Sequence, residues 1–96
     1  MDMDNERLER IKEACCSASG ITTEDIESQS RKRIIVSAKT IYIFHAAKVT
    51  MNIGLISRSV AWGEPSYWKA LRRYKDSMKY DKQFKLLAEE VEACLR

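Results

Sequence analysis

Two groups of basic side chains are the residues of this chain with the most informative chemistry. The first is the run Arg31-Lys32-Arg33 in a polar stretch. The second lies between positions 66 and 79, where lysines and arginines recur at spacings that place them on one side of a helix. Cations that neutralise phosphates release counterions, so such clusters are suited to a nucleic-acid backbone. A solvated surface is the alternative explanation of both groups.

The net charge of the chain is unevenly distributed. The 96 residues carry a formal charge of +3. Residues 1–29 hold eight acids and three bases, and residues 86–96 hold three acids and one base. The block 30–85 holds thirteen bases and three acids, a net charge of +10. This block would concentrate a polyanion if its charges share a face, unless the acidic flanks cover it.

Side chains for catalysis or metal binding form no recognisable pattern. Three cysteines at positions 15, 16 and 94 match neither a zinc spacing nor an even disulfide framework, so we expect reduced, half-buried thiols. His45 lies in an apolar run without a partner pattern, which predicts a hydrogen-bonded core histidine. No glycine-rich loop ends in Lys followed by Ser or Thr. We therefore expect no enzyme activity, no metal and no cofactor.

Apolar spacing predicts an all-α fold, a compact bundle of about six helices in one domain spanning residues 1–96. Alternating strand patterns and internal repeats are not found. Helices are expected over residues 5–18, 24–26, 34–49, 53–60, 65–79 and 81–95. Residues 52–79 are typical of a helix-turn-helix, with a short helix, a break at 61–65 and a second helix whose outer face is basic.

Several residues predict where these helices begin and end. Gly20 is placed to end the first helix, and Thr22 or Thr23, Asn52 and Asp81 are candidate N-caps. Gly63 is expected to take a backbone conformation that other residues avoid, and Pro65 suits a first helical turn. We expect the remaining large side chains near this turn to pack in the core. One inward-facing stripe of the second helix is formed by Tyr67, Leu71, Tyr74 and Met78. Trp62 and Trp68 are expected to pack at the junction of the two helices.

The apolar run 34–49 is too short for a bilayer and carries Lys39, His45 and Lys48, which predicts a buried helix and no membrane association. The first six residues are acidic, unlike a secretory signal. We expect a cytoplasmic protein.

Three segments carry a resemblance to a known family. They are Ser-Arg-Lys-Arg at 30–33, Val-Ser-Ala-Lys at 36–39 and Ile-Gly-Leu-Ile at 53–56. Their order resembles the C-terminal DNA-binding domain of the bacterial chromosomal replication initiator DnaA, a Trp-repressor-like helix-turn-helix domain, over about residues 21–78. The helices at 5–18 and 81–95 are additions. The resemblance implies minor-groove and backbone contacts by Arg31 and Arg33, and a contact by Lys39.

The family's recognition motif, Gly-Gly-Arg-Asp-His-Ser/Thr-Thr, aligns with Ala-Trp-Gly-Glu-Pro-Ser-Tyr at 61–67. Glu64 stands for the Asp and Ser66 supplies a hydroxyl, whereas the Arg and His are absent. We expect Ser66 and Lys69 to face base edges. The predicted DNA-binding set is Arg31, Lys32, Arg33, Lys39, Ser66, Tyr67, Lys69, Arg72 and Arg73.

Two functional hypotheses remain open. The first is binding of double-stranded DNA, either sequence-related or non-specific, by a replication-initiator-like module acting in DNA replication. The second is a protein-protein interaction or dimerisation module on the same scaffold, through Trp62, Tyr67 or the last helix.

Overall fold

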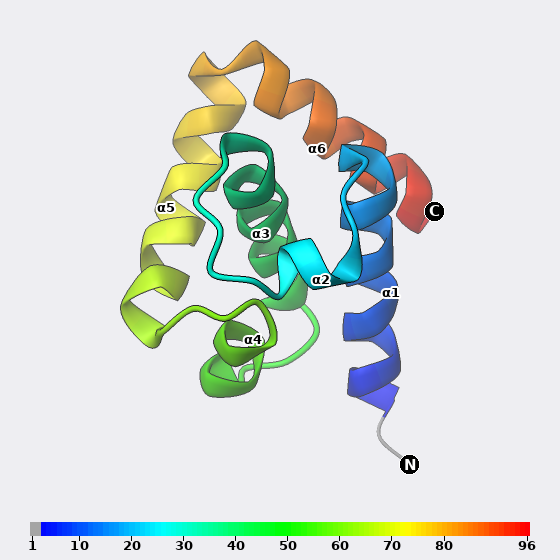
Figure 1. Ribbon diagram of the computed structural model, residues 1–96, viewed down its shortest axis with the longest axis vertical. Coiled ribbons are helices and arrows are strands. Elements are labelled where there is room, and N and C mark those ends of the chain that lie inside the picture. The colour runs from blue at the N-terminus through cyan, green and yellow to red at the C-terminus, as the bar shows by residue number, and fades with distance from the viewer. Residues whose placement is uncertain (1–2) are drawn as a thin grey trace.

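The computed structural model describes residues 3–96 of the chain and consists of six α-helices (Figure 1). No strand occurs within this range, so the prediction of an all-α fold with about six helices is confirmed. The helices are α1 (Met3–Ser19), α2 (Thr23–Ile26), α3 (Arg33–Ala46), α4 (Ile53–Ser59), α5 (Glu64–Tyr80) and α6 (Lys82–Leu95).

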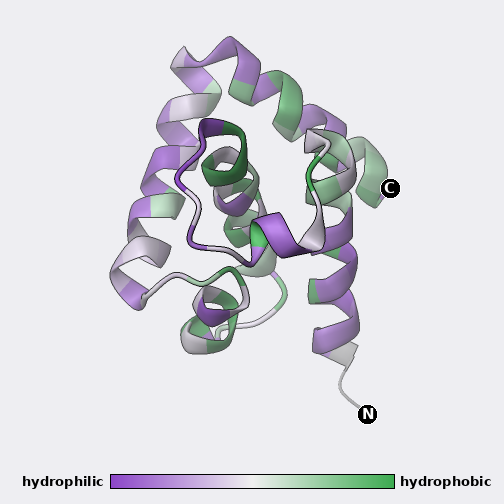
Figure 2. Cartoon of the chain, viewed as in Figure 1, coloured by the Kyte–Doolittle hydropathy of each residue, from purple (hydrophilic) through white to green (hydrophobic). Residues whose placement is uncertain are grey.

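Helix α3 lies at the centre of the fold and is contacted by each of the other five helices. Its residues 38–43 are buried all around the helix, which is what a helix surrounded by neighbours requires. The core that it anchors includes Leu8 from α1, Ile56 from α4 and Val91 from α6. Figure 2 shows the contrast between the apolar turns of α3 and the largely hydrophilic α5.

The first helix ends as its sequence predicts. Gly20 has a φ of +71°, and the Ile21 amide donates to the Cys16 carbonyl at 3.1 Å, which closes the helix end. Thr22 then caps α2 in a reciprocal arrangement with Asp25, with both hydrogen bonds at 3.1 Å. The acidic residues of α2 lie at the positive end of its dipole.

Helix α3 ends at Ala46, three residues before the predicted boundary. The amides of Lys48 and Val49 donate to carbonyls only three residues earlier, so the chain tightens and leaves the helix. Apolar residues continue through this turn because Ala47 and Val49 still pack against the core. Apolar content alone therefore did not mark the boundary.

The connection between α4 and α5 corrects one prediction. Asn52 caps α4 as expected, accepting from the Leu55 amide at 3.0 Å. Ala61, rather than Gly63, adopts the left-handed conformation, with a φ of 59°. Gly63 is extended, with φ −89° and ψ 171°, a conformation open to any residue. Pro65 lies in the first turn of α5 as expected.

Helix α5 packs through the predicted stripe. Tyr67 and Tyr74 are buried, and Leu71 and Met78 are half-buried against the core. The Tyr74 ring stacks on Phe44, with 3.7 Å between the ring centroids. Aromatic stacking therefore fixes α5 against the central helix.

Asp81 forms the corner between α5 and α6. Its amide donates to the Ser77 carbonyl at 2.8 Å, which completes α5, and its carboxylate accepts from the Phe84 amide at 3.1 Å, which begins α6. The predicted N-cap is confirmed. The hydrogen bond from the Phe84 amide lowers the pKa of Asp81 below its ordinary value, and the hydrogen bond from Arg33 contributes to the same shift as a smaller cause.

The thiols and the histidine differ from expectation. Cys15 and Cys16 are buried and Cys94 is exposed, so none is half-buried. Burial raises the pKa of the Cys15 thiol far above its ordinary value. The Nε2 atom of His45 is buried without a hydrogen-bond partner among residues 3–96, and burial, aided by Lys48, lowers the pKa of the imidazole.

Among the helices described, none has the length and apolar character needed to cross a bilayer.

Candidate nucleic-acid interface

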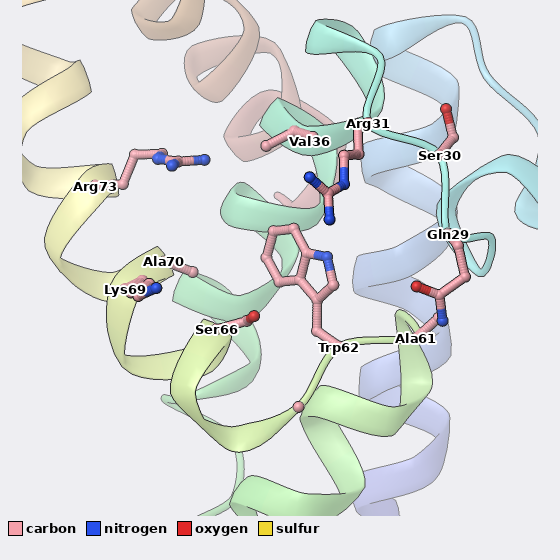
Figure 3. Close-up of a pocket in the computed structure, with 11 residues that line it drawn as sticks. Gln29, Ser30, Arg31, Val36, Ala61, Trp62, Ser66, Lys69, Ala70 and Arg73 are labelled. Atoms are coloured by element: carbon pink, nitrogen blue, oxygen red, sulfur yellow. The ribbon is translucent and has the colours of Figure 1, made fainter.

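Three segments enclose a hollow of about 400 Å³ on the surface, and the first of them is distant in the sequence from the other two. They are the loop before α3, the turn after α4 and the first half of α5. Figure 3 shows Trp62 between Arg31 of the loop and the side chains of α5. The α5 residues with polar side chains at this hollow are Ser66, Lys69 and Arg73. The hollow therefore brings part of the first basic cluster to part of the second.

Hydrogen bonds order the loop that carries Arg31. The Ser28 hydroxyl donates to the Asp25 carbonyl at 2.6 Å and accepts from the Ser30 amide at 3.2 Å. The Ser30 hydroxyl in turn accepts from the Lys32 amide at 3.3 Å. Serine side chains thus supply the hydrogen-bond partners that backbone groups of a helix or strand would find in regular secondary structure. Arg31 extends from a loop whose backbone is held on both sides.

The end of α4 determines the position of Trp62. The Ala61 amide donates to the Arg58 carbonyl at 3.1 Å, and the Trp62 amide donates to the Ser57 carbonyl at 2.9 Å. These bonds, with Ala61 left-handed, form a Schellman ending, in which the residue after the left-handed position turns back onto the helix. The Trp62 indole therefore packs partly against the core and partly lines the hollow.

Lys39 connects the loop to the turn from inside the protein. Its ammonium donates to the Ser28 carbonyl and lies 5.3 Å from the centroid of the Trp62 ring. The side chain is 0% exposed, and burial lowers the pKa of the ammonium below its ordinary value. A cation over an indole face is an electrostatically favourable contact. Lys39 thereby supports two walls of the hollow.

The cations at the hollow are not neutralised by acidic neighbours within the described range. Among residues 3–96, ion pairs involve Lys12 and Arg33 but not Arg31, Lys69 or Arg73. No Asp or Glu of these residues lines the hollow, and Glu64 is exposed outside its lining. The positive potential of this surface is therefore available to an anionic ligand.

The other predicted cations lie around the hollow or are engaged elsewhere. Lys32 and Arg72 are exposed but do not line it. The Arg33 guanidinium donates to the Asp81 carboxylate at 3.0 Å while its side chain stays 79% exposed. Solvent screens an exposed pair of this kind, so a phosphate can compete for Arg33.

Two residues of the predicted DNA-binding set lie in the interior. Lys39 is enclosed because its position on α3 faces the loop and the turn, and Tyr67 is only 5% exposed because it belongs to the inward stripe of α5. In this conformation neither side chain reaches the surface, and we leave both out of the candidate interface.

Sequence reasoning assigned Trp62 and Trp68 to packing, and the structure separates them. Trp68 is 56% exposed, with its ring edge-on to Tyr67 at 5.0 Å between centroids, so the packing prediction is wrong for this residue. Trp62 does pack, but it also lines the hollow. A left-handed Ala61 directly before Trp62 has no sequence signal, so this second role was not predictable.

The arrangement of cations, a hydroxyl and an aromatic ring offers binding chemistry. Groups of three or more potential metal ligands are not found within residues 3–96. Comparison with known proteins adds no functional assignment. No protein-family model, curated protein or solved structure matches this chain.

Proposed function

We propose that this protein binds double-stranded DNA through the surface around the hollow. The observation that carries the proposal is that Arg31 lines the same hollow as Lys69 and Arg73 of α5, from which it is distant in sequence, and that residues 3–96 contribute no carboxylate to this lining. Cations gathered on a groove-sized surface are the electrostatic feature expected of a nucleic-acid interface. The resemblance to the DNA-binding domain of DnaA, noted from the sequence, agrees with this proposal.

In the proposed complex α4, its turn and α5 act as a helix-turn-helix. The first turns of α5 enter the major groove, where Ser66 and Lys69 face base edges. Arg72 and Arg73, further along the helix, contact phosphates, and Arg31 follows the adjacent backbone or minor groove from the loop. Lysine favours the acceptor atoms of guanine, whereas serine discriminates little between bases.

A charge-matched pair of double variants tests the proposal. Lys69→Ala/Arg73→Ala removes two cations from the hollow, and Lys75→Ala/Lys85→Ala removes two exposed cations that do not line it. We expect the first variant to weaken binding by about tenfold for each charge-assisted hydrogen bond to DNA that it removes. The second should change affinity far less. The measurement is fluorescence anisotropy with a labelled duplex of about 20 base pairs at low salt.

Two results would contradict the proposal. The absence of binding by the wild-type protein at low salt would refute DNA binding. Equal decreases in affinity for the two double variants would show that net charge, rather than this surface, drives the interaction.

A protein-interaction function has a separate structural candidate. Ile34, Phe84 and Leu87 line a smaller hollow of about 210 Å³ between the start of α3 and α6. Ile34 is 42% exposed there, and Leu86 of α6 is also exposed. Sedimentation at increasing protein concentration, with Ile34→Ser as the variant, tests whether this surface mediates dimerisation.

A further inference from the structure

We propose that the hollow accepts one unpaired nucleotide, whose base stacks on Trp62 and whose phosphates contact the surrounding cations. This inference rests on the proposed function and specifies the kind of DNA that the surface prefers, namely duplex DNA containing a base that has left the stack.

The two faces of the Trp62 ring have different surroundings. Lys39 approaches the indole from the interior, where its ammonium is fully buried. Lys39 does not line the hollow, whereas Trp62 does. The geometry therefore places the cation against the inner face and leaves the other side of the ring toward the hollow. An aromatic face at the bottom of a basic depression is the platform on which single-stranded bases stack.

The size and lining of the hollow suit a nucleotide. A volume of about 400 Å³ lies in the range of roughly 300–1,000 Å³ that is typical of small-ligand sites. Arg31 on one side and Arg73 on the other supply cations for phosphates, and Lys69 lies between Ser66 and Arg73 on α5, where it can donate to the base. Ser66 and Gln29 add groups that can donate and accept hydrogen bonds at the base edge.

A fully paired duplex would leave this aromatic platform unused. Within a duplex each base is covered on both faces by its neighbours, so only the backbone and groove edges are accessible to the protein. The cations can contact those phosphates, but the indole gains a stacking partner only when a base is extruded. Trp62 consequently provides selectivity for an unpaired base in addition to the charge-driven affinity.

Three DNA probes with the same paired sequence test this inference: a fully paired duplex, the same duplex with one bulged thymine, and the same duplex with an abasic residue at the bulge. The two bulged probes have the same phosphates and differ only in the base. We expect the thymine bulge to bind about tenfold more tightly than the abasic bulge, as base stacking on an aromatic ring predicts. Trp62→Leu should bring this ratio to about one, whereas Trp68→Phe should retain it.

Binding of all three probes with equal affinity would overturn the inference and leave the proposed function intact. No binding of any probe would overturn both. If Trp62→Leu does not fold, as judged by thermal unfolding, fluorescence decides the matter. Trp68→Phe leaves Trp62 as the single tryptophan, and quenching by the thymine bulge but not by the abasic bulge is the supporting result. Identical emission with both probes would contradict stacking.

Discussion

Lys39 is a buried cation that holds two surface segments in place. Its ammonium bonds to the Ser28 carbonyl and covers the inner face of Trp62. Burying an ammonium costs several kcal/mol, whereas a hydrogen bond to a charged group returns about 1.5–3 kcal/mol. Because these terms oppose each other, we attribute to Lys39 a larger role in positioning the loop than in global stability.

Replacing Lys39 by Met separates these two roles. We expect the amides of residues 28–32 to exchange with solvent about tenfold faster, because the loop loses its internal partner, while the unfolding free energy changes by less than about 2 kcal/mol. Hydrogen-deuterium exchange followed by mass spectrometry measures the first effect and urea denaturation the second.

Lys48→Met is the matched control for this experiment. Lys48 also lies over an aromatic ring, 4.2 Å from the Phe44 centroid, but it is exposed and follows the C-terminal end of α3, whereas the loop precedes the N-terminal end. The loop amides should exchange at the wild-type rate in this variant. Unchanged exchange in Lys39→Met as well would show that the serine hydrogen bonds hold the loop without Lys39.

At the scale of elements, the turn between α4 and α5 is organised by a residue that is poorly suited to it. Ala61 is left-handed, which costs a non-glycine residue about 1–2 kcal/mol, while Gly63 occupies an extended position that does not require glycine. A Cβ atom at Gly63 would meet only the Pro65 ring among the described residues, at 3.6 Å, an ordinary contact. Glycine would suit the left-handed position 61 better than alanine does, and alanine would fit the extended position 63 as well as glycine does.

We expect Ala61→Gly and Gly63→Ala each to raise the unfolding free energy by about 0.5 kcal/mol or more. The first relieves backbone strain in the folded state, and the second reduces the conformational entropy of the unfolded chain. Chemical denaturation measures both.

Gly20→Ala should do the opposite of Gly63→Ala. It places alanine at a φ of +71° where no atom of the described residues lies within 4 Å of the new Cβ, so only the strain acts and stability falls by about 1 kcal/mol. A decrease in stability in Gly63→Ala comparable to that in Gly20→Ala would show that position 63 needs glycine after all.

Helix ends were predictable where a local side chain forms them. Asn52 and Asp81 cap the helices that follow them because the hydrogen bond spans only three residues. The end of α3 and the left-handed Ala61 have no such signal, since packing onto the core determines them. The meeting of Arg31 with Arg73 is likewise tertiary, so the sequence predicted both basic clusters but not the hollow between them. Lys39 was misassigned because its spacing could not show what covers it.

At the scale of the whole molecule, the positive surface sets the expected salt dependence of binding. Within residues 3–96, the exposed cations of the candidate interface that form no ion pair are Arg31, Lys32, Lys69, Arg72 and Arg73. Because Lys69 is assigned to base edges, the other four cations neutralise about four phosphates, and log affinity should fall with log salt at a slope of about −3 to −4.

Anisotropy titrations across a salt series measure this slope, and Lys69→Ala/Arg73→Ala should reduce its magnitude by about one, because only Arg73 of this pair is assigned to a phosphate. A slope close to zero in the wild-type protein would indicate that phosphate contacts do not drive the association.

Helix α1 contacts α3, α6 and α2 but not α5, and Figure 1 shows it on the other side of the central helix from α5. The exposed acids of α1 are therefore separated from the hollow by the body of the protein. Because acidic and basic surfaces lie on different sides of the molecule, it has a permanent electric dipole moment even though its net charge is small. A phosphate chain would exert a torque on it at a distance, so that rotation brings α5 forward before the first contact forms.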